Sequence, residues 1–194
     1  RTDRTIALYL LDPVTRRLTR AGNPVPAGLA DPYGLCLYAS RGGEFFVFAN
    51  DSGTGQFRQW RIRDDGGDIR VSRVRAFRVG SQAEGCVADD ETGALYVAEE
   101  DVALWRYFAD PGAGNARRAI DRVGGASGLT ADLEGVSIWQ GRDGRGYIVQ
   151  SNQGASRYAV YRREGANAYV GSFELVDDAQ TGVDGTSDTD GLAV

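Results

Sequence analysis

The sequence predicts an all-β fold, a β-propeller built of four-stranded antiparallel blades. Short β-branched and aromatic runs alternate with polar residues, and turns rich in Gly and Asp separate these runs. The whole pattern recurs about every fifty residues, which is the length of one blade. A parallel β-helix would repeat over far fewer residues, and a β-sandwich would not repeat one motif at a fixed spacing.

The first strand of each unit begins with a polar residue, a glycine and an apolar run. This motif occurs at 33–37, 84–88, 134–138 and 190–194. The first strand of a propeller blade is the innermost one and lines the central channel. We therefore expect these segments to lie side by side around that channel.

The other strands of each unit follow in chain order. The second strand is expected after a glycine-containing turn, at 45–48, 95–98 and 147–149. The third strand carries aromatic residues, at 57–60, 103–106 and 158–161. The fourth strand closes each unit, at 74–77, 117–120 and 169–173. Four strands per unit match the blade of a propeller.

These strands divide the chain into complete and partial blades. Complete blades are expected at 33–80, 84–123 and 134–176, with partial blades at 4–28 and 190–194. The chain thus holds about four blades' worth of sequence and is incomplete at both ends. Because it also contains no Met, we expect an internal piece of a larger propeller.

The composition excludes several classes of function. The 194 residues include no His, so a Ser-His-Asp triad, a His-ligated zinc site and phosphohistidine chemistry are all excluded. The net charge of −5 argues against a nucleic-acid partner. No apolar run approaches the length of a membrane span, so no membrane partner is expected.

Cys36 and Cys86 are too few for a disulfide framework or a thiolate metal cluster. Neither begins the C-x5-R motif of a cysteine phosphatase. The pattern favours two buried free thiols, with a disulfide between them as the alternative.

The repeat also places polar residues at equivalent points of successive blades. We call these the mouth residues, because they should form an arc around one mouth of the channel: Tyr33, Glu84, Glu134 and Asp190. Asp132 lies shortly before Glu134, while Glu100 and Gln153 end second strands. This arrangement gathers the carboxylates of Glu84, Glu100, Asp132 and Glu134 near a common centre.

Carboxylates gathered in this way repel one another unless a cation binds between them. Ca²⁺ takes six to eight oxygen ligands, whereas softer metals prefer His or Cys. Each acid by itself is better explained as a solvated turn residue, but equivalent positions in consecutive blades favour a cation site, because the repeat brings the acids together. The segment 184–191 is a second oxygen-rich loop, but it lacks the spacing of an EF-hand and is also typical of an ordinary turn.

Several motifs in order along the chain resemble those of the β-propeller phytases. They are Asp31-Pro32-Tyr33-Gly34-Leu35, Ser81-Gln82-Ala83-Glu84-Gly85, Ala98-Glu99-Glu100-Asp101, Asp132-Leu133-Glu134-Gly135, Ser151-Asn152-Gln153-Gly154 and the segment 184–191. This family consists of six-bladed, calcium-dependent phosphatases that hydrolyse phytate, myo-inositol hexakisphosphate. The resemblance covers essentially the whole chain, which would form the middle of such a propeller.

The resemblance implies a role for each matching residue. The catalytic carboxylates Glu84, Glu100, Asp132 and Glu134 would, with Gln153, hold several active-site Ca²⁺ ions. Tyr33 would contact calcium or a substrate phosphate, Asp190 would contact substrate at the same mouth, and Asp184 would belong to a separate, stabilising calcium site. Arg1 would bind phosphate. One departure is that Asp51 and Ser52 stand where the family typically carries a phosphate-binding Lys.

The resemblance therefore implies calcium-dependent hydrolysis of phytate, or calcium-phytate, through direct attack by a metal-activated water. The alternatives are a propeller lactonase or esterase with a single calcium, and a non-catalytic propeller that binds partners. A monomer that is secreted or periplasmic is expected. Residues 1–194 alone are expected to be inactive, because the ring of blades cannot close.

Overall fold

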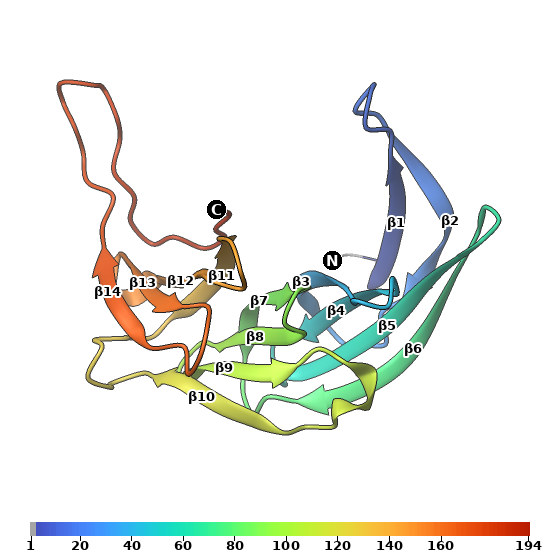
Figure 1. Ribbon diagram of the computed structural model, residues 1–194, viewed down its shortest axis with the longest axis horizontal. Coiled ribbons are helices and arrows are strands. Elements are labelled where there is room, and N and C mark those ends of the chain that lie inside the picture. The colour runs from blue at the N-terminus through green and yellow to red at the C-terminus, as the bar shows by residue number, and fades with distance from the viewer. Residues whose placement is uncertain (1–2) are drawn as a thin grey trace.

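The computed structural model describes residues 3–194 and confirms the all-β prediction. Within these residues the chain forms three four-stranded antiparallel sheets and one two-stranded sheet. Figure 1 shows the sheets following one another around an open arc, with β3, β7 and β11 on its inner side. Strands follow chain order within every sheet, which is the organisation of propeller blades.

The strands lie where the repeat predicted them. The two-stranded sheet consists of β1 (Thr5–Leu11) and β2 (Leu18–Pro26). Blade I consists of β3 (Pro32–Ala39), β4 (Phe45–Asp51), β5 (Gln56–Asp65) and β6 (Asp68–Arg78). Blade II consists of β7 (Ala83–Asp89), β8 (Ala94–Glu99), β9 (Ala103–Phe108) and β10 (Arg117–Arg122). Blade III consists of β11 (Leu133–Gln140), β12 (Gly146–Asn152), β13 (Arg157–Arg162) and β14 (Tyr169–Phe173).

Helical structure in the described residues consists of two short 3-10 turns, η1 (Pro111–Ala113) and η2 (Gln153–Ala155). Neither turn has the length or the apolar character that crossing a membrane requires, and no other helix occurs in residues 3–194.

The segment 190–194 corrects one expectation. The sequence predicted a strand there, but these residues form none, because no strand within 3–194 pairs with them. The segment nevertheless lies beside β11, where the backbone N–H of Gly135 donates to the carbonyl of Asp190 at 2.9 Å. It therefore occupies the place of a neighbouring inner strand without its hydrogen-bonded structure.

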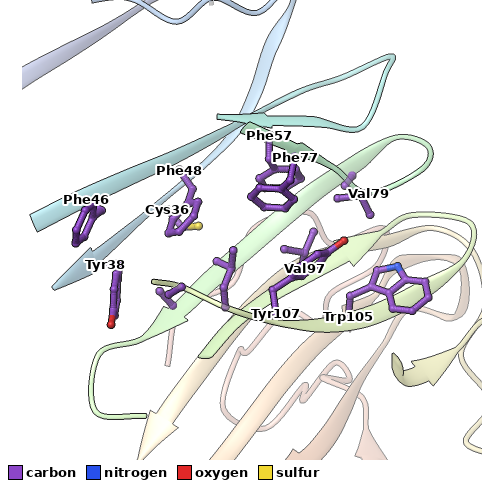
Figure 2. Packing of buried hydrophobic residues seen from close by; sticks show 14 of the residues in the cluster. Cys36, Tyr38, Phe46, Phe48, Phe57, Phe77, Val79, Val97, Trp105 and Tyr107 are labelled. Atoms are coloured by element: carbon purple, nitrogen blue, oxygen red, sulfur yellow. The ribbon is translucent and has the colours of Figure 1, made fainter. Parts of the chain in front are cut away.

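Apolar side chains pack between the blades. Alternating side chains of β3 point to opposite faces, so Cys36 and Tyr38 are buried while Leu35 and Leu37 are exposed. At the contact between blades I and II, Phe77 packs against both Phe57 and Tyr107, with ring centroids 5.0 Å apart in each pair. Figure 2 shows this layer of aromatic and aliphatic side chains. Packing of this kind fixes the angle between neighbouring blades.

Cys36 and Cys86 form a disulfide, so the expectation of two free thiols is wrong. The cysteines lie on β3 and β7, the inner strands of neighbouring blades, with their Cα atoms 5.7 Å apart. That separation suits a disulfide. Their distance in sequence, 50 residues, equals the repeat, which places them at adjoining positions. The bond ties the inner strands of blades I and II together.

A buried ion pair joins blades II and III. Arg163, which is 1% exposed, directly follows β13 and donates hydrogen bonds of 2.7 and 2.6 Å to the carboxylate of Asp89 at the end of β7. Glu91 also contacts this guanidinium, at 2.7 Å. A buried charge is costly unless it is paired, and this pairing satisfies both partners across the blade interface.

Candidate metal centre

Glycines allow the inner strands to approach closely. A Cβ atom added to Gly34 would lie 1.9 Å from the carbonyl oxygen of Glu84, and one added to Gly85 would lie 2.2 Å from that of Glu134. These positions are too close for any side chain. The glycine that follows each mouth residue therefore brings the next mouth residue alongside it, which explains why the repeat pairs a polar residue with glycine.

Three glutamates converge on the inner side of the arc. One carboxylate oxygen from each of Glu84, Glu100 and Glu134 lies within 4.8 Å of the others. Glu84 lies near the start of β7, Glu100 directly follows β8, and Glu134 lies near the start of β11. Glu100 and Glu134 are only 7% and 6% exposed, and Glu84 is half-buried. We call this set the glutamate cluster.

Burial and mutual repulsion disfavour the ionised forms of Glu134 and Glu100 in the glutamate cluster, as their pKa values show. Burial, a hydrogen bond with Glu84 and the charges of the neighbouring carboxylates raise the pKa of Glu134 to about 8. Burial also raises the pKa of Glu100, and the charges of Asp132 and Glu84 add to this effect, against an opposing hydrogen bond from Gln82. A hydrogen bond to Glu84, with burial and the same negative field, raises the pKa of Tyr33.

The hydrogen-bonding state of the cluster fits a hard cation. Oε1 of Glu100 and Oε2 of Glu134 are buried, and no group in the described part of the chain forms a hydrogen bond with either atom. Unpartnered buried oxygens are costly, and a divalent ion bound by oxygen ligands would satisfy them. With carboxylates as its donors, the cluster suits Ca²⁺ or Mg²⁺ better than a softer metal.

The other residues expected at the mouth lie around the cluster. Asp132 follows a cis peptide bond, is partly buried, and its charge acts on Glu100. The side-chain amide of Gln153 donates to Oδ1 of Asp190 at 2.9 Å, and the charge of Asp190 acts on Glu134. Asp132, Gln153 and Asp190 are thus neighbours of the cluster rather than members of the three-oxygen group.

Asp184 and Arg1 are not brought to the cluster. Asp184 is exposed in the segment after β14, and no contact found within residues 3–194 joins it to the three glutamates. Figure 1 shows this segment extending away from blade III before it returns to β11. Arg1 lies outside the described residues. The phosphate role expected of Arg1 and the calcium role expected of Asp184 both stay predictions.

Asp51 stands where a phosphate-binding Lys would be expected from the resemblance. Its side chain is buried rather than directed at a ligand. It is 3% exposed, and its Oδ2 accepts hydrogen bonds from the backbone N–H groups of Ala30 and Asp31 at 2.8 and 2.9 Å. Glu99 and Asn152 end the second strands of blades II and III and are equally buried. None of these three residues is predicted as functional from the sequence, although a polar residue ends the second strand of every blade.

Sequence comparison relates the chain to one family of known proteins. A family model described as Phytase matches residues 1–194. The chain is also 42% identical, over 195 residues, to a Bacillus subtilis (strain 168) protein named 3-phytase. This similarity covers 98% of the chain and 50% of the relative, so the chain spans about half the length of that protein.

Proposed function

The chain belongs to the phytase family, and from that premise we propose that its glutamate cluster binds Ca²⁺ within an enzyme that hydrolyses phytate. One observation carries the proposal: three carboxylate oxygens lie within 4.8 Å of one another, and two buried oxygens of the same residues have no hydrogen-bond partner within residues 3–194. The named activity of the Bacillus subtilis relative, a 3-phytase, supports phytate as the substrate.

The cation would be held by Glu84, Glu100 and Glu134, with Asp132 and Tyr33 as neighbouring ligands. Asp190 and Gln153, which are hydrogen-bonded to each other, would extend the oxygen-rich surface toward a further ion. Ca²⁺ fits better than Mg²⁺ because it accepts many oxygen ligands in irregular geometry, whereas Mg²⁺ demands an octahedron and retains its waters. We propose more than one bound ion, because these carboxylates exceed what one divalent charge neutralises.

The cation, the glutamate cluster and Tyr33 would have different roles in the reaction. When bound, the cation supplies the positive charge that attracts phosphate groups and makes a nearby water more acidic. The glutamate cluster keeps that charge at the inner side of the arc. Tyr33 stays protonated, because its pKa is raised, and can donate a hydrogen bond to Glu84 or to a phosphate oxygen. No His or Cys nucleophile is required, in keeping with a chain that contains no His.

The proposal is tested with the full-length protein. We expect the protein to release phosphate from phytate, and we expect EGTA to abolish this activity and added Ca²⁺ to restore it. Glu84→Gln and Glu134→Gln should each lower the rate of phosphate release by at least a hundredfold. Counting bound calcium separates the alternatives. Ester hydrolysis with one bound ion and no phosphate release would support a single-calcium lactonase or esterase, and calcium binding without turnover would support a binding propeller.

We also propose that the protein works outside the cytoplasm, in the periplasm or the medium. The Cys36–Cys86 disulfide supports this proposal, because disulfides persist in oxidising compartments and are rare in the cytosol. Cell fractionation with an antibody to the protein tests it, and recovery of the reduced protein in the cytosolic fraction would count against it.

A further inference from the structure

The last residue of the second strand plays one role in all three blades. These residues, which we call the latch residues, are Asp51, Glu99 and Asn152. Each is 3% exposed. Each pairs in register with the first residue of the inner strand: Pro32, Ala83 and Leu133 respectively. Polar residues buried at equivalent points of a repeat must satisfy equivalent hydrogen-bonding needs.

The side-chain oxygen of each latch residue accepts hydrogen bonds from the loop that leads to the mouth residue. In blade II, Oε1 of Glu99 accepts from the backbone N–H and the hydroxyl of Ser81, both at 2.7 Å. In blade III, Oδ1 of Asn152 accepts from the same two groups of Thr130, at 3.0 and 2.9 Å. Asp51 binds the corresponding loop of blade I. The loop is thus fixed shortly before it delivers the mouth residue.

The residue that follows each latch residue also binds this loop, through its backbone N–H group. The backbone N–H of Glu100 donates to the carbonyl of Gln82 at 3.1 Å, and that of Gln153 donates to the carbonyl of Asp132 at 3.0 Å. In blade II these contacts join Glu99 and Glu100, at and directly after the end of β8, to the loop that leads into β7 and its residue Glu84. Glu99 therefore links the two segments that carry Glu84 and Glu100.

Glu99 and Glu100 are adjacent and chemically identical, yet their surroundings differ. Both oxygens of Glu99 are used by the protein: Oε1 by Ser81, and Oε2 by the indole N–H of Trp105 at 2.6 Å, with Arg117 at 3.7 Å. In contrast, Oε1 of Glu100 has no partner among the described residues. Glu99 is therefore satisfied within blade II, whereas Glu100 has an oxygen left for a ligand.

We propose that Glu99 is a positioning residue, which sets the separation of Glu84 and Glu100 before any cation binds. This inference rests on the proposed function of the glutamate cluster as a cation site. The carboxylate of Glu99 spans from the loop at Ser81 to Trp105 on β9, so it holds the loop and the second strand in one arrangement. A preformed site spends less of its binding energy on ordering its own ligands.

The test measures Ca²⁺ affinity by calorimetry in the full-length protein. Glu99→Gln keeps the size of the side chain but removes its charge, so its single carbonyl oxygen cannot replace both acceptors. We expect Ca²⁺ to bind about tenfold more weakly, the scale on which residues that orient metal ligands act. Trp105→Phe removes only the donor to Oε2 and is a milder variant in case Glu99→Gln folds poorly. For Trp105→Phe we expect the Ca²⁺ affinity to fall by about threefold, which is less than the tenfold effect expected of Glu99→Gln.

A matched control separates positioning from general loss of stability. Asp89→Asn weakens a buried ion pair at the opposite end of β7, away from the glutamate cluster. It should lower stability and leave the Ca²⁺ affinity unchanged. Hydrogen exchange of the metal-free protein provides a second readout: the amide of Ser81 should exchange faster in Glu99→Gln than in Asp89→Asn.

The outcomes distinguish this inference from the proposed function. If Glu84→Gln abolishes Ca²⁺ binding while Glu99→Gln and Trp105→Phe bind as tightly as the unchanged protein, the positioning role is overturned and the cation site stands. If the unchanged protein binds no Ca²⁺, both are overturned. Weaker binding in the Glu99 and Trp105 variants, with unchanged binding in Asp89→Asn, supports the inference.

Discussion

Arg163 of blade III and Asp89 of blade II form a fully buried pair, with two hydrogen bonds of 2.7 and 2.6 Å between guanidinium and carboxylate. Burial opposes ionisation of Asp89, but hydrogen bonds from Arg163 and Thr92 outweigh it, so the pKa of Asp89 lies below its ordinary value. The contact joins blades whose inner strands also carry Glu84 and Glu134. It therefore holds blades II and III together at the end of β7 that lies away from the glutamate cluster.

Removing one member of this pair should be costly. Asp89→Ala leaves the buried guanidinium with only Glu91 as a carboxylate partner, and we expect the free energy of unfolding to fall by about 3 kcal/mol. Urea denaturation followed by far-UV circular dichroism measures this change. Arg70→Ala is the control, because its ion pairs with Asp65 and Asp68 are exposed and should be worth less than about 1 kcal/mol. Equal effects of the two variants would contradict the prediction.

The glutamate cluster should make stability depend on pH and calcium together. The folded-state pKa of Glu134 is raised to about 8, so metal-free protein loses stability as the pH rises from the ordinary value of 4.5 through 8. A bound cation requires the ionised carboxylate and reverses this loss. The increase in melting temperature on replacing EGTA with Ca²⁺ should therefore grow between pH 6 and pH 9.

Glu134→Gln is the control for this pH dependence. It removes the titrating group, so metal-free protein should change less with pH and gain less from calcium. An increase in melting temperature that is the same at every pH in the unchanged protein would count against the prediction.

The disulfide between Cys36 and Cys86 should contribute substantially to stability. It closes a loop with a sequence separation of 50, and the chain-entropy relation gives about 4 kcal/mol for a loop of that size. We expect the double variant Cys36→Ala, Cys86→Ala to unfold at lower urea by a corresponding amount. Dithiothreitol should destabilise the unchanged protein and leave the double variant unaffected, and insensitivity of both would contradict the prediction.

A methyl group on the inner strands should disturb the metal centre directly. Gly85→Ala places a Cβ atom 2.2 Å from the carbonyl oxygen of Glu134, so β7 and β11 must separate. We expect a loss of about 1–3 kcal/mol in stability and weaker binding of Ca²⁺ by calorimetry. Gly171→Ala on β14 meets no atom within 4 Å and is the matched control, with little effect on either quantity.

Much of this arrangement could be predicted from the sequence because the repeat fixes register. Once Glu84 and Glu134 are recognised as equivalent, the geometry of successive blades brings them together, and the structure bears this out. The repeat does not determine which way adjacent residues face at the end of a strand. Glu99 and Glu100 therefore could not be distinguished, since their different environments depend on Ser81 and Trp105, which come from other parts of the blade.

Other differences have the same origin. The proximity of Asp132 to Glu134 in sequence predicts that it joins the glutamates, but Asp132 precedes β11, so the alternation of side chains along that strand does not fix where its carboxylate points. The disulfide was judged from the number of cysteines, although its spacing of 50 residues was itself the repeat. Contacts between equivalent positions were thus predictable, and contacts made by side chains across a blade were not.

The Cys36–Cys86 bond also determines what a protease can do to this chain. The turn between β5 and β6 is exposed and contains Gly66 and Gly67, which makes it a natural site of cleavage. A cut there falls between the two cysteines, so the resulting pieces stay covalently joined through the inner strands. Nicked protein would then migrate as one species until it is reduced, and its two parts could reassemble without having to find each other in solution.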